Sequence, residues 1–400
     1  MMNRIAGKNI VMGMTGGIAC YKAVDLISRL KKAGAEVDVI LTEAAQEFIT
    51  PLTVQTMAKS PCHVDMFKPI DSFNPEHISL AKKADLIVIA PATANVIGKI
   101  ANGIADDFLT TVLMASRSKI LIAPAMNTYM YTNPIFQENL KKLESLNYEL
   151  IKPETGLLAC GDEGVGKLEE PAKIMEYIDY LLTEKDLDGK KVVVTAGPTE
   201  EPIDPVRFIT NKSSGKMGYE IAREAKARGA ETILISGKTN LDAPVGVHRV
   251  NVQTTVEMLN AIEEYFDSCD LLIKAAAPAD YRVQNTSDKK IKKTDENLNI
   301  TLVENPDIAK HFGEKKGNRF IIGFAAETDS FIENAKKKIE KKNLNFIVLN
   351  DVTKEGAGFN ADTNIVTIIN MLGEEKKFPK MSKREVAKVI LDEYLLELKK

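Results

Sequence analysis

The sequence contains no tryptophan, few cysteines and histidines, and no long apolar run. Its four cysteines form no C-x-x-C pair, which argues against a disulfide framework and a structural zinc site, and its four histidines have no metal-ligand spacing. No stretch approaches the roughly 18 apolar residues that span a bilayer, and the N-terminus lacks the apolar core of a signal peptide. We therefore expect a cytoplasmic protein without a membrane segment.

The charge balance is close to neutral, with a formal net charge of -3 and a pI near 6.0. It gives no general electrostatic reason to bind nucleic acid or an anionic membrane, although local basic clusters can hold phosphates. The 400 residues, 44% hydrophobic and 27% charged, are typical of a globular protein with two or three domains of about 100–200 residues each. Small anionic ligands are the expected partners.

The pattern of apolar strands and helical stretches occurs twice along the chain. A strand beginning at residues 7–11 precedes a Gly-rich turn, and one beginning at 189–193 precedes Thr195-Ala196-Gly197-Pro198. "ADLIVIAPATAN" at 84–95 likewise parallels "CDLLIKAAAPAD" at 269–280. We therefore expect an α/β protein with two doubly wound, Rossmann-like domains built on mainly parallel sheets, one over residues 1–186 and one over 187–400.

Helix boundaries are also expected from local signals in the second half. Ser213 and Ser214 are expected to cap a helix that Gly229 ends, and a last helix is expected over about 383–399. In both halves, the Ala/Pro turns after the buried strands are the main candidate sites, because sheets of this type bind ligands at the carboxyl ends of their strands.

The turn "GMTGGIA" at 13–19 joins a strand to a helix, so its small residues let a phosphate approach backbone N–H groups. It is not G-x-G-x-x-G, and no acidic residue is evident for a ribose, so a mononucleotide or flavin phosphate is favoured over a dinucleotide. Three further segments add specificity: "PEHISLAKKADL" contains His77, "APAMNTYMY" contains Asn127, and "ACGDEGVGK" contains Cys160.

Taken singly, these three residues have ordinary structural explanations. A free cysteine is usually a small buried hydrophobe, which is the expected state of Cys20, Cys62 and Cys269. His77 fits a helix start after Pro75, and an isolated asparagine is often a turn residue. The presence of all three motifs in one chain favours a role for His77, Asn127 and Cys160 in an active site over these structural explanations.

With these motifs the sequence resembles the flavin-containing cysteine decarboxylases, and especially the bifunctional phosphopantothenoylcysteine decarboxylase/phosphopantothenate-cysteine ligases, over nearly all of its length. The resemblance implies a flavodoxin-like FMN domain in which His77 is catalytic, Asn127 contacts the substrate carboxylate and Cys160 reprotonates the intermediate. The flavin would act as an electron sink by oxidising the substrate thiol, so that the carboxylate can leave as carbon dioxide. The residues expected to bind FMN are Gly16, Gly17, Thr42, Thr93 and Asn95.

One departure from the family lies in the loop after Cys160. The family loop commonly ends in arginine, whereas this chain has Lys167, which keeps the charge but loses the bidentate fork. Binding geometry at this position is therefore expected to differ.

The second half resembles the ligase domain of the same family. Its segment "TAGPTEEPIDPVRFITNKSSGKMG" at 195–218 matches the ligase motif in which Asn211 serves the acyl-cytidylate intermediate and Arg207 lies at the active site. The run Lys289-Lys290-Ile291-Lys292-Lys293 would usually be a solvated loop, but the family motif Lys-x-Lys-Lys aligns with Lys290 as the catalytic lysine. The additional Lys289 leaves room for an alignment slip of one residue.

The resemblance implies a two-step ligation. CTP with Mg²⁺ activates the carboxylate of 4'-phosphopantothenate, releasing pyrophosphate, and the amine of cysteine then displaces CMP. Magnesium usually binds substrate phosphates with one or two protein carboxylates, so the sequence does not define its ligands, and Asp280 is a candidate. With Arg207 and Lys290, the residues expected to bind CTP or the acyl-cytidylate are Lys274, Ala275, Ala276, Asp280, Asn305, Pro306, Asp307, Ile308, Ala309, Phe324, Lys338 and Lys342.

Three alternatives compete with this interpretation: a flavoprotein acting on peptide cysteines or as a prenyl acceptor, a regulatory flavin-binding subunit, and a nicotinamide-dependent oxidoreductase. The ligase half argues against the first, the complete set His77, Asn127 and Cys160 against the second, and the missing G-x-G-x-x-G against the third. The family also implies a homo-oligomer, in which trimers of the first domain and dimers of the second build a dodecamer.

Overall fold

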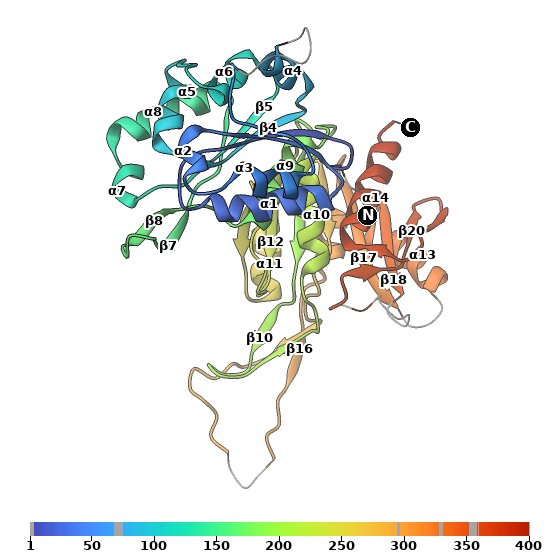
Figure 1. The fold of residues 1–400 in the computed structure, drawn as a ribbon. Helices are drawn as coiled ribbons and strands as arrows, with labels where there is room; N and C mark the ends of the chain where they lie inside the picture. The colour runs from blue at the N-terminus through green and yellow to red at the C-terminus, as the bar shows by residue number, and fades with distance from the viewer. Residues whose placement is uncertain are drawn as a thin grey trace. The chain divides into compact units, whose positions relative to one another are not determined.

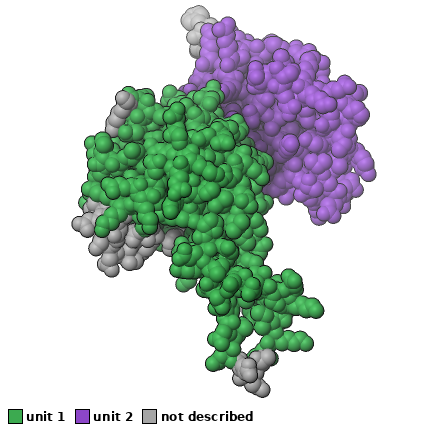
Figure 2. Space-filling view, turned by 180° about the vertical axis from the view of Figure 1, so that it is seen from behind, with its two compact units in different colours: residues 1, 184–400 green, residues 2–183 purple. Residues whose placement is uncertain are grey.

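The computed structural model describes residues 4–67, 75–293, 297–327, 331–351, 358 and 360–399. The chain divides into two compact units, residues 2–183 and residues 184–400 (Figures 1 and 2). Each unit has its own sheet and its own buried apolar clusters. The predicted α/β class with two doubly wound domains is confirmed. Within the described residues, no helix combines the length and apolar character needed to cross a bilayer.

The first unit is built on a six-stranded parallel sheet in the order β3-β2-β1-β4-β5-β6. Its strands are almost continuously buried because helices cover both faces. The strands are β1 (Asn9–Met14), β2 (Glu36–Leu41), β3 (Cys62–His63), β4 (Leu86–Ala92), β5 (Lys119–Pro124) and β6 (Glu149–Leu150). A separate hairpin pairs β7 (Glu154–Leu157) with β8 (Glu163–Lys167).

Helices alternate with these strands, and the longer ones bury an apolar stripe against the sheet. In α1, Ala23, Leu26, Ile27 and Leu30 are buried at helical spacing. Two separate clusters form the core on the two faces of the sheet. The helices are α1 (Cys20–Lys32), α2 (Glu43–Gln46), α3 (Pro51–Ala58), α4 (Glu76–Lys83), α5 (Ala94–Ala101), α6 (Phe108–Ala115), α7 (Thr128–Tyr131), α8 (Pro134–Ser145) and α9 (Pro171–Leu182).

The second unit has an eight-stranded sheet in the order β13-β12-β9-β14-β17-β18-β20-β21. The first six strands are parallel, and the last two add antiparallel to the β18 edge. The strands are β9 (Lys191–Ala196), β12 (Glu231–Ser236), β13 (His248–Asn251), β14 (Leu271–Lys274), β17 (Phe320–Glu327), β18 (Phe346–Asp351), β20 (Val366–Asn370) and β21 (Glu375–Lys377).

The described part of this unit contains five helices, and two of their ends differ from the sequence expectation. The cap of α10 is Gly215, not Ser213 or Ser214, because its φ of 74° and a Cβ position 2.7 Å from the Thr239 Cγ2 both favour glycine. The last helix ends at Glu397, two residues before the expected end at residue 399. The helices are α10 (Lys216–Ala227), α11 (Thr255–Phe266), α12 (Ile308–Glu314), α13 (Phe331–Lys342) and α14 (Lys383–Glu397).

Three short antiparallel strand pairs in the described residues of this unit are separate from the main sheet. They are β10 (Glu200–Pro202) with β11 (Phe208–Thr210), β15 (Tyr281–Val283) with β16 (Leu302–Glu304), and β19 (Thr363–Asn364) with β22 (Met381–Ser382). Between β15 and β16, the described residues 284–293 and 297–301 form an arm that projects away from the sheet, and β15 at its start contacts β10 (Figure 1). This arm carries the lysines of residues 289–293.

Two candidate active sites

Three strand ends of the first sheet meet where the flavin was expected. Thr15, after β1, donates from its hydroxyl to the Pro91 carbonyl at 2.8 Å and accepts from the Thr93 N–H at 2.9 Å. Thr93 caps α5, which carries the exposed Asn95, and Thr42 caps α2 after β2. The carboxyl edge of the sheet therefore brings together the Gly16-Gly17 turn and the two capped helix starts.

Gly16 lies in the tightest part of this edge. A Cβ at this position would lie 2.5 Å from the Ala44 Cβ and 2.8 Å from the Ala44 carbonyl oxygen. The turn after β1 thus packs directly on α2 at Gly16, whereas a Cβ on the next residue, Gly17, would approach only the Thr93 Cγ2, at 3.9 Å. A small-residue turn between strand and helix, flanked by threonine hydroxyls, fits the phosphate of FMN.

Gly16→Ala should lower the free energy of unfolding by about 1–3 kcal/mol, because the new methyl group overpacks against Ala44. It should also reduce the flavin retained after purification, measured by the ratio of flavin to protein absorbance. Gly98→Ala is the matched control, since a Cβ there would approach only the Asn139 side chain, at 3.8 Å. Equal flavin content in both variants would contradict the placement of FMN at this turn.

Asn127, Cys160 and an unforeseen third residue, Asp162, form one polar cluster. Asn127 follows β5 and donates from Nδ2 to the Cys160 Sγ at 3.4 Å and to the Asp162 carboxylate at 3.3 Å. The Cys160 thiol in turn donates to Asp162 at 3.4 Å. Cys160 is exposed, whereas Cys20, Cys62 and Cys269 are buried as expected. Asp162 was missed, although its place two residues after the cysteine was a usable signal.

Two glycines hold the hairpin that carries Cys160 against Asn127. A Cβ on Gly164 would lie 2.4 Å from the Thr128 Oγ1, and one on Gly166, whose φ is 143°, would lie 2.2 Å from the Met126 carbonyl oxygen. The Met126 N–H also donates to the Gly166 carbonyl at 2.9 Å. The backbone of β8 therefore packs directly on the chain around Asn127.

His77 and Lys167 stand apart from this cluster. His77 is half-buried in the first turn of α4, and among the described residues no hydrogen bond or ion pair joins it to Asn127 or Cys160. Lys167 makes an ion pair with Glu154 at 2.9 Å, and the hydrogen bond to that carboxylate raises the pKa of the lysine. Glu154 thus holds the Lys167 side chain at the base of the hairpin, where the two residues are also paired in the β-ladder.

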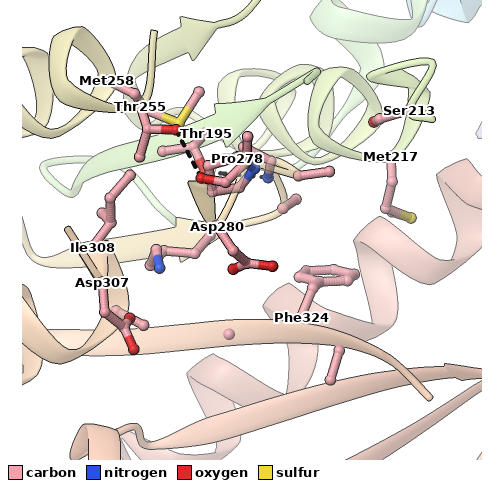
Figure 3. Close-up of a pocket in the computed structure, with 18 of the residues that line it drawn as sticks. Thr195, Ser213, Met217, Thr255, Met258, Pro278, Asp280, Asp307, Ile308 and Phe324 are labelled. Carbon is pink, nitrogen blue, oxygen red and sulfur yellow. Dashed lines mark hydrogen bonds between the residues drawn. The ribbon is translucent and has the colours of Figure 1, made fainter. Parts of the chain in front are cut away.

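The second unit contains a pocket of about 580 Å³ at the carboxyl edge of its sheet (Figure 3). Every residue expected to bind CTP lines it except Arg207 and Lys290. In Figure 3 the Asp280 carboxylate and the Phe324 ring point into the pocket from opposite walls, and Asp307 and Ile308 lie at one side. The pocket thus has the size, location and polar lining of a nucleotide site.

A buried hydrogen-bond network shapes the turn after β14. The Thr195 hydroxyl accepts from the Ala276 N–H at 3.2 Å, and the Thr199 hydroxyl accepts from the Ala279 N–H at 2.9 Å. Asn305 donates to the Ala279 carbonyl at 2.9 Å. The Asn305 side-chain amide therefore links two segments of the pocket wall. Asn305 was expected to contact CTP, but this hydrogen bond is explained more simply if the residue holds the turn after β14 in position.

Positive charge gathers on the side of the pocket near Asp307. Lys342 pairs with Asp307 at 3.0 Å. Burial in the pocket wall lowers the pKa of Lys274 to about 7, although Asp307 partly opposes the shift. For Asp307, burial raises the pKa, but the Lys310 N–H and the Lys342 ammonium outweigh it and the net shift is downward. An anionic ligand would restore the charged form of Lys274.

CTP binding should therefore become weaker as pH rises from about 7. Above that pH, free Lys274 is mainly neutral, so binding a polyphosphate must take up a proton, and affinity should fall by up to about tenfold per pH unit until the pKa of the complex is reached. Calorimetry in buffers of different ionisation enthalpy should measure close to one proton taken up near pH 8.5. Lys274→Met should abolish this uptake, and uptake equal to that of the wild type would contradict the assignment.

Asn211, Arg207 and Lys290 lie outside the pocket lining. Asn211 donates to the Pro278 carbonyl at 2.9 Å, so it borders the lining turn. Arg207 donates from Nε to the buried Asp204 at 3.0 Å and from Nη2 to the Ile291 carbonyl at 2.9 Å. The hydrogen bonds of Arg207 hold the pKa of Asp204 far below its usual range. Lys290 is exposed on the arm, next to Ile291, whose carbonyl accepts the Arg207 hydrogen bond.

Sequence reasoning also missed several lining residues. Ser213 to Lys216 line the pocket, as do Asn364 and Lys383 from the last part of the chain. The Ser-Ser-Gly-Lys run adjoins Asn211 and was a usable signal. Asn364 and Lys383 stand in no recognisable motif.

Two family models match the chain: "Flavoprotein" over residues 2–183, and "DNA/pantothenate metabolism flavoprotein C-terminal domain" over residues 187–396. The coenzyme A biosynthesis bifunctional protein CoaBC of Bacillus subtilis is 48% identical over 96% of both chains. The proteins of the same name from Haemophilus influenzae and Escherichia coli are 45% and 40% identical, over 98% and 97% of both chains.

Among solved structures, the C-terminal domain of a CoaBC protein is 45% identical, with a TM-score of 0.46, over 53% of this chain and 99% of that one. A mutant PPC decarboxylase complexed with pantothenoylaminoethenethiol is 30% identical, with a TM-score of 0.40, over 43% of this chain and 96% of that one.

The fold and the family models define the class: a flavoprotein domain followed by a pantothenate-metabolism domain. The chain belongs to the CoaBC family of bifunctional coenzyme A biosynthesis proteins. It is accordingly a bifunctional enzyme that combines cysteine ligation with decarboxylation.

Proposed function

We propose that the chain ligates L-cysteine to 4'-phosphopantothenate at the expense of CTP and then decarboxylates the product to 4'-phosphopantetheine with FMN. The observation that carries the proposal is the meeting of the exposed Cys160 thiol with the Asn127 amide at the edge of the flavoprotein sheet. The other unit adds a lysine-lined pocket large enough for a nucleotide.

In the first unit, FMN bound at Gly16, Gly17, Thr42, Thr93 and Asn95 supplies the electron sink for decarboxylation. The Asn127 Nδ2 group, which now donates to Cys160 and Asp162, is suited to hold the substrate carboxylate. Cys160 gives its proton to the carbon that has lost carbon dioxide, and Asp162 holds the thiol in place meanwhile. His77 is proposed as a further catalytic residue on the strength of the family motif.

In the second unit, the carboxylate of 4'-phosphopantothenate attacks the α-phosphate of CTP and pyrophosphate leaves. Lys274, Lys338 and Lys342 place positive charge around the nucleotide, and Lys290 stabilises the developing charge of this step. Asn211 serves the acyl-cytidylate from the border of the pocket, and Arg207 fixes the backbone next to Lys290. The cysteine amine then displaces CMP.

Mg²⁺ is proposed to enter with the nucleotide phosphates. In the described part of the chain, no group of three acidic, histidine or cysteine side chains is arranged as a metal site. The Asp280 carboxylate points into the pocket and has no ion pair or side-chain hydrogen bond among the described residues. A single carboxylate fits a magnesium ion that is carried mainly by phosphates and water.

The test incubates the purified protein with 4'-phosphopantothenate, L-cysteine, CTP and Mg²⁺, and follows pyrophosphate, carbon dioxide and product mass. Formation of 4'-phosphopantetheine that requires CTP supports both halves of the proposal. Untouched CTP would remove the ligase half. A homo-oligomer, with a dodecamer as the full assembly, is proposed as well, and light-scattering mass measurements check it.

A further inference from the structure

The Asp162 carboxylate accepts a hydrogen bond from the same side-chain amide that the proposed function assigns to the substrate carboxylate. The Asn127 Nδ2 group donates to the Asp162 Oδ2 at 3.3 Å, and the Cys160 thiol donates to the same oxygen at 3.4 Å. Among the described residues, these two donors are the only side-chain partners of Asp162, and it makes no ion pair. The charge of this carboxylate therefore has no cationic partner in the part of the chain that the structure describes.

The orientation of the Asn127 amide is fixed by the backbone that follows it. Its Oδ1 accepts from the Tyr129 N–H at 2.8 Å, so that Asn127 caps α7. The Nδ2 group is therefore the end of the amide that faces Cys160 and Asp162, and it is also the only end that can donate to a carboxylate. A substrate carboxylate held by Asn127 therefore shares this NH2 group with Asp162.

The hairpin holds the Asp162 backbone in place beside Asn127. The Leu158 N–H donates to the Asp162 carbonyl at 2.8 Å, and the Gly161 N–H donates to the Leu158 carbonyl at 3.0 Å. The strand that follows, β8, packs through its glycines directly on the chain around Asn127. Two carboxylate oxygens that accept from one amide nitrogen lie within about 6 Å of each other, so a bound substrate carboxylate faces the charge of Asp162 at short range.

We propose that Asp162 raises the energy of the bound substrate by electrostatic repulsion of its carboxylate, and that the loss of carbon dioxide relieves this repulsion. The inference rests on the proposed decarboxylase function. Two carboxylates at this separation disfavour each other's charge, whereas carbon dioxide is neutral. The repulsion therefore acts more strongly on the bound substrate than on the transition state, in which negative charge is already moving away from the carboxylate.

The step needs no reactant beyond those of the proposed function. The bond between the α-carbon and the carboxylate breaks, and carbon dioxide leaves. The electron pair of that bond passes into the oxidised thiol group of the substrate, which is the electron sink already assigned. Cys160 later gives its proton to the carbon that lost carbon dioxide. Asp162 exchanges neither a proton nor electrons with the substrate, and its charge is the same before and after the step.

The test uses Asp162→Asn, which removes the charge but keeps the size and a hydrogen-bond acceptor. With 4'-phosphopantothenoylcysteine as the substrate, kcat and KM for carbon dioxide release should fall together, each about 10- to 100-fold, so that kcat/KM changes much less than either. Asp162→Glu keeps the charge and should retain more of the wild-type kcat. Glu163→Gln, which removes an exposed carboxylate from the next position of the same hairpin, is the matched control and should leave both constants within about twofold of the wild type. Flavin content and melting curves check that each variant folds.

Two unreactive ligands distinguish electrostatic repulsion from loosened packing. 4'-Phosphopantothenoylserine has the carboxylate but no thiol to oxidise, and calorimetry should show that Asp162→Asn binds it about 10- to 100-fold more tightly than the wild type does. 4'-Phosphopantetheine has no carboxylate, and both proteins should bind it equally. Weaker or equal binding of the serine compound would mean that Asp162 only positions the thiol, and tighter binding with an unchanged kcat would mean that it only competes for Asn127. Either result overturns the proposal. If the wild type does not decarboxylate 4'-phosphopantothenoylcysteine, the proposed function itself fails.

Discussion

Cys160→Ser should stop the reaction after ligation, so that 4'-phosphopantothenoylcysteine accumulates and 4'-phosphopantetheine formation falls about 10²- to 10⁴-fold. The reason is chemical, since a hydroxyl is a much weaker acid than a thiol and the loss of a positioned proton donor has effects of this size. The substitution is nearly isosteric, and a serine can keep the hydrogen bonds to Asn127 and Asp162. Product masses in a single reaction mixture measure both steps.

The same chain contains the control for this experiment. CTP consumption is proposed for the other unit, so it should be unaffected by Cys160→Ser. Cys62→Ala, at a buried position in the same unit as Cys160, should retain decarboxylation apart from a modest loss of stability. A Cys160→Ser enzyme that still forms 4'-phosphopantetheine at the wild-type rate would show that another group delivers the proton.

Lys290→Gln should reduce pyrophosphate release about 10²- to 10³-fold, the usual cost of removing one stabilising group from a charged transition state. The backbone on both sides of Lys290 is fixed. The Lys289 carbonyl accepts from the Ser287 hydroxyl at 2.7 Å, while the Ile291 N–H and carbonyl bond to Asp204 and Arg207 at 3.1 and 2.9 Å. Lys290 is thus the lysine held between two anchored residues.

Lys289→Gln is the matched control, because it removes the same charge one position earlier on the same exposed arm. It should keep pyrophosphate release within about twofold of the wild type. If Lys289→Gln is the inactive variant and Lys290→Gln the active one, the family motif aligns one residue earlier than assumed and the catalytic lysine changes with it.

The parts of the site that the sequence predicted are those set by local pattern. Buried strands that end in small-residue turns place Gly16, Thr93 and Ala276 at sheet edges, because parallel strands of one sheet have their carboxyl ends together. The helix start at Gly215 was missed, because the deciding contact, with Thr239, comes from a different strand end. Local capping signals do not contain such contacts.

The contribution of the last forty residues was not predictable for a similar reason. Asn364 reaches the pocket through the pairing of β19 with β22, and Lys383 follows that pairing directly. Strand pairs of two residues carry almost no periodic signal, so neither their existence nor their register is evident from the sequence. Asp162 differs, because it lies within a motif whose cysteine was already singled out.

The two closed cores have a consequence for how such a gene can change. Each unit buries its own apolar residues around its own sheet, and the division falls near residue 184. If the gene were divided into two reading frames at that point, each of the two polypeptides would keep its own hydrophobic core. Selection can therefore act on the halves as separable modules: one can be split off, copied or retired from catalysis while the other continues to serve metabolism.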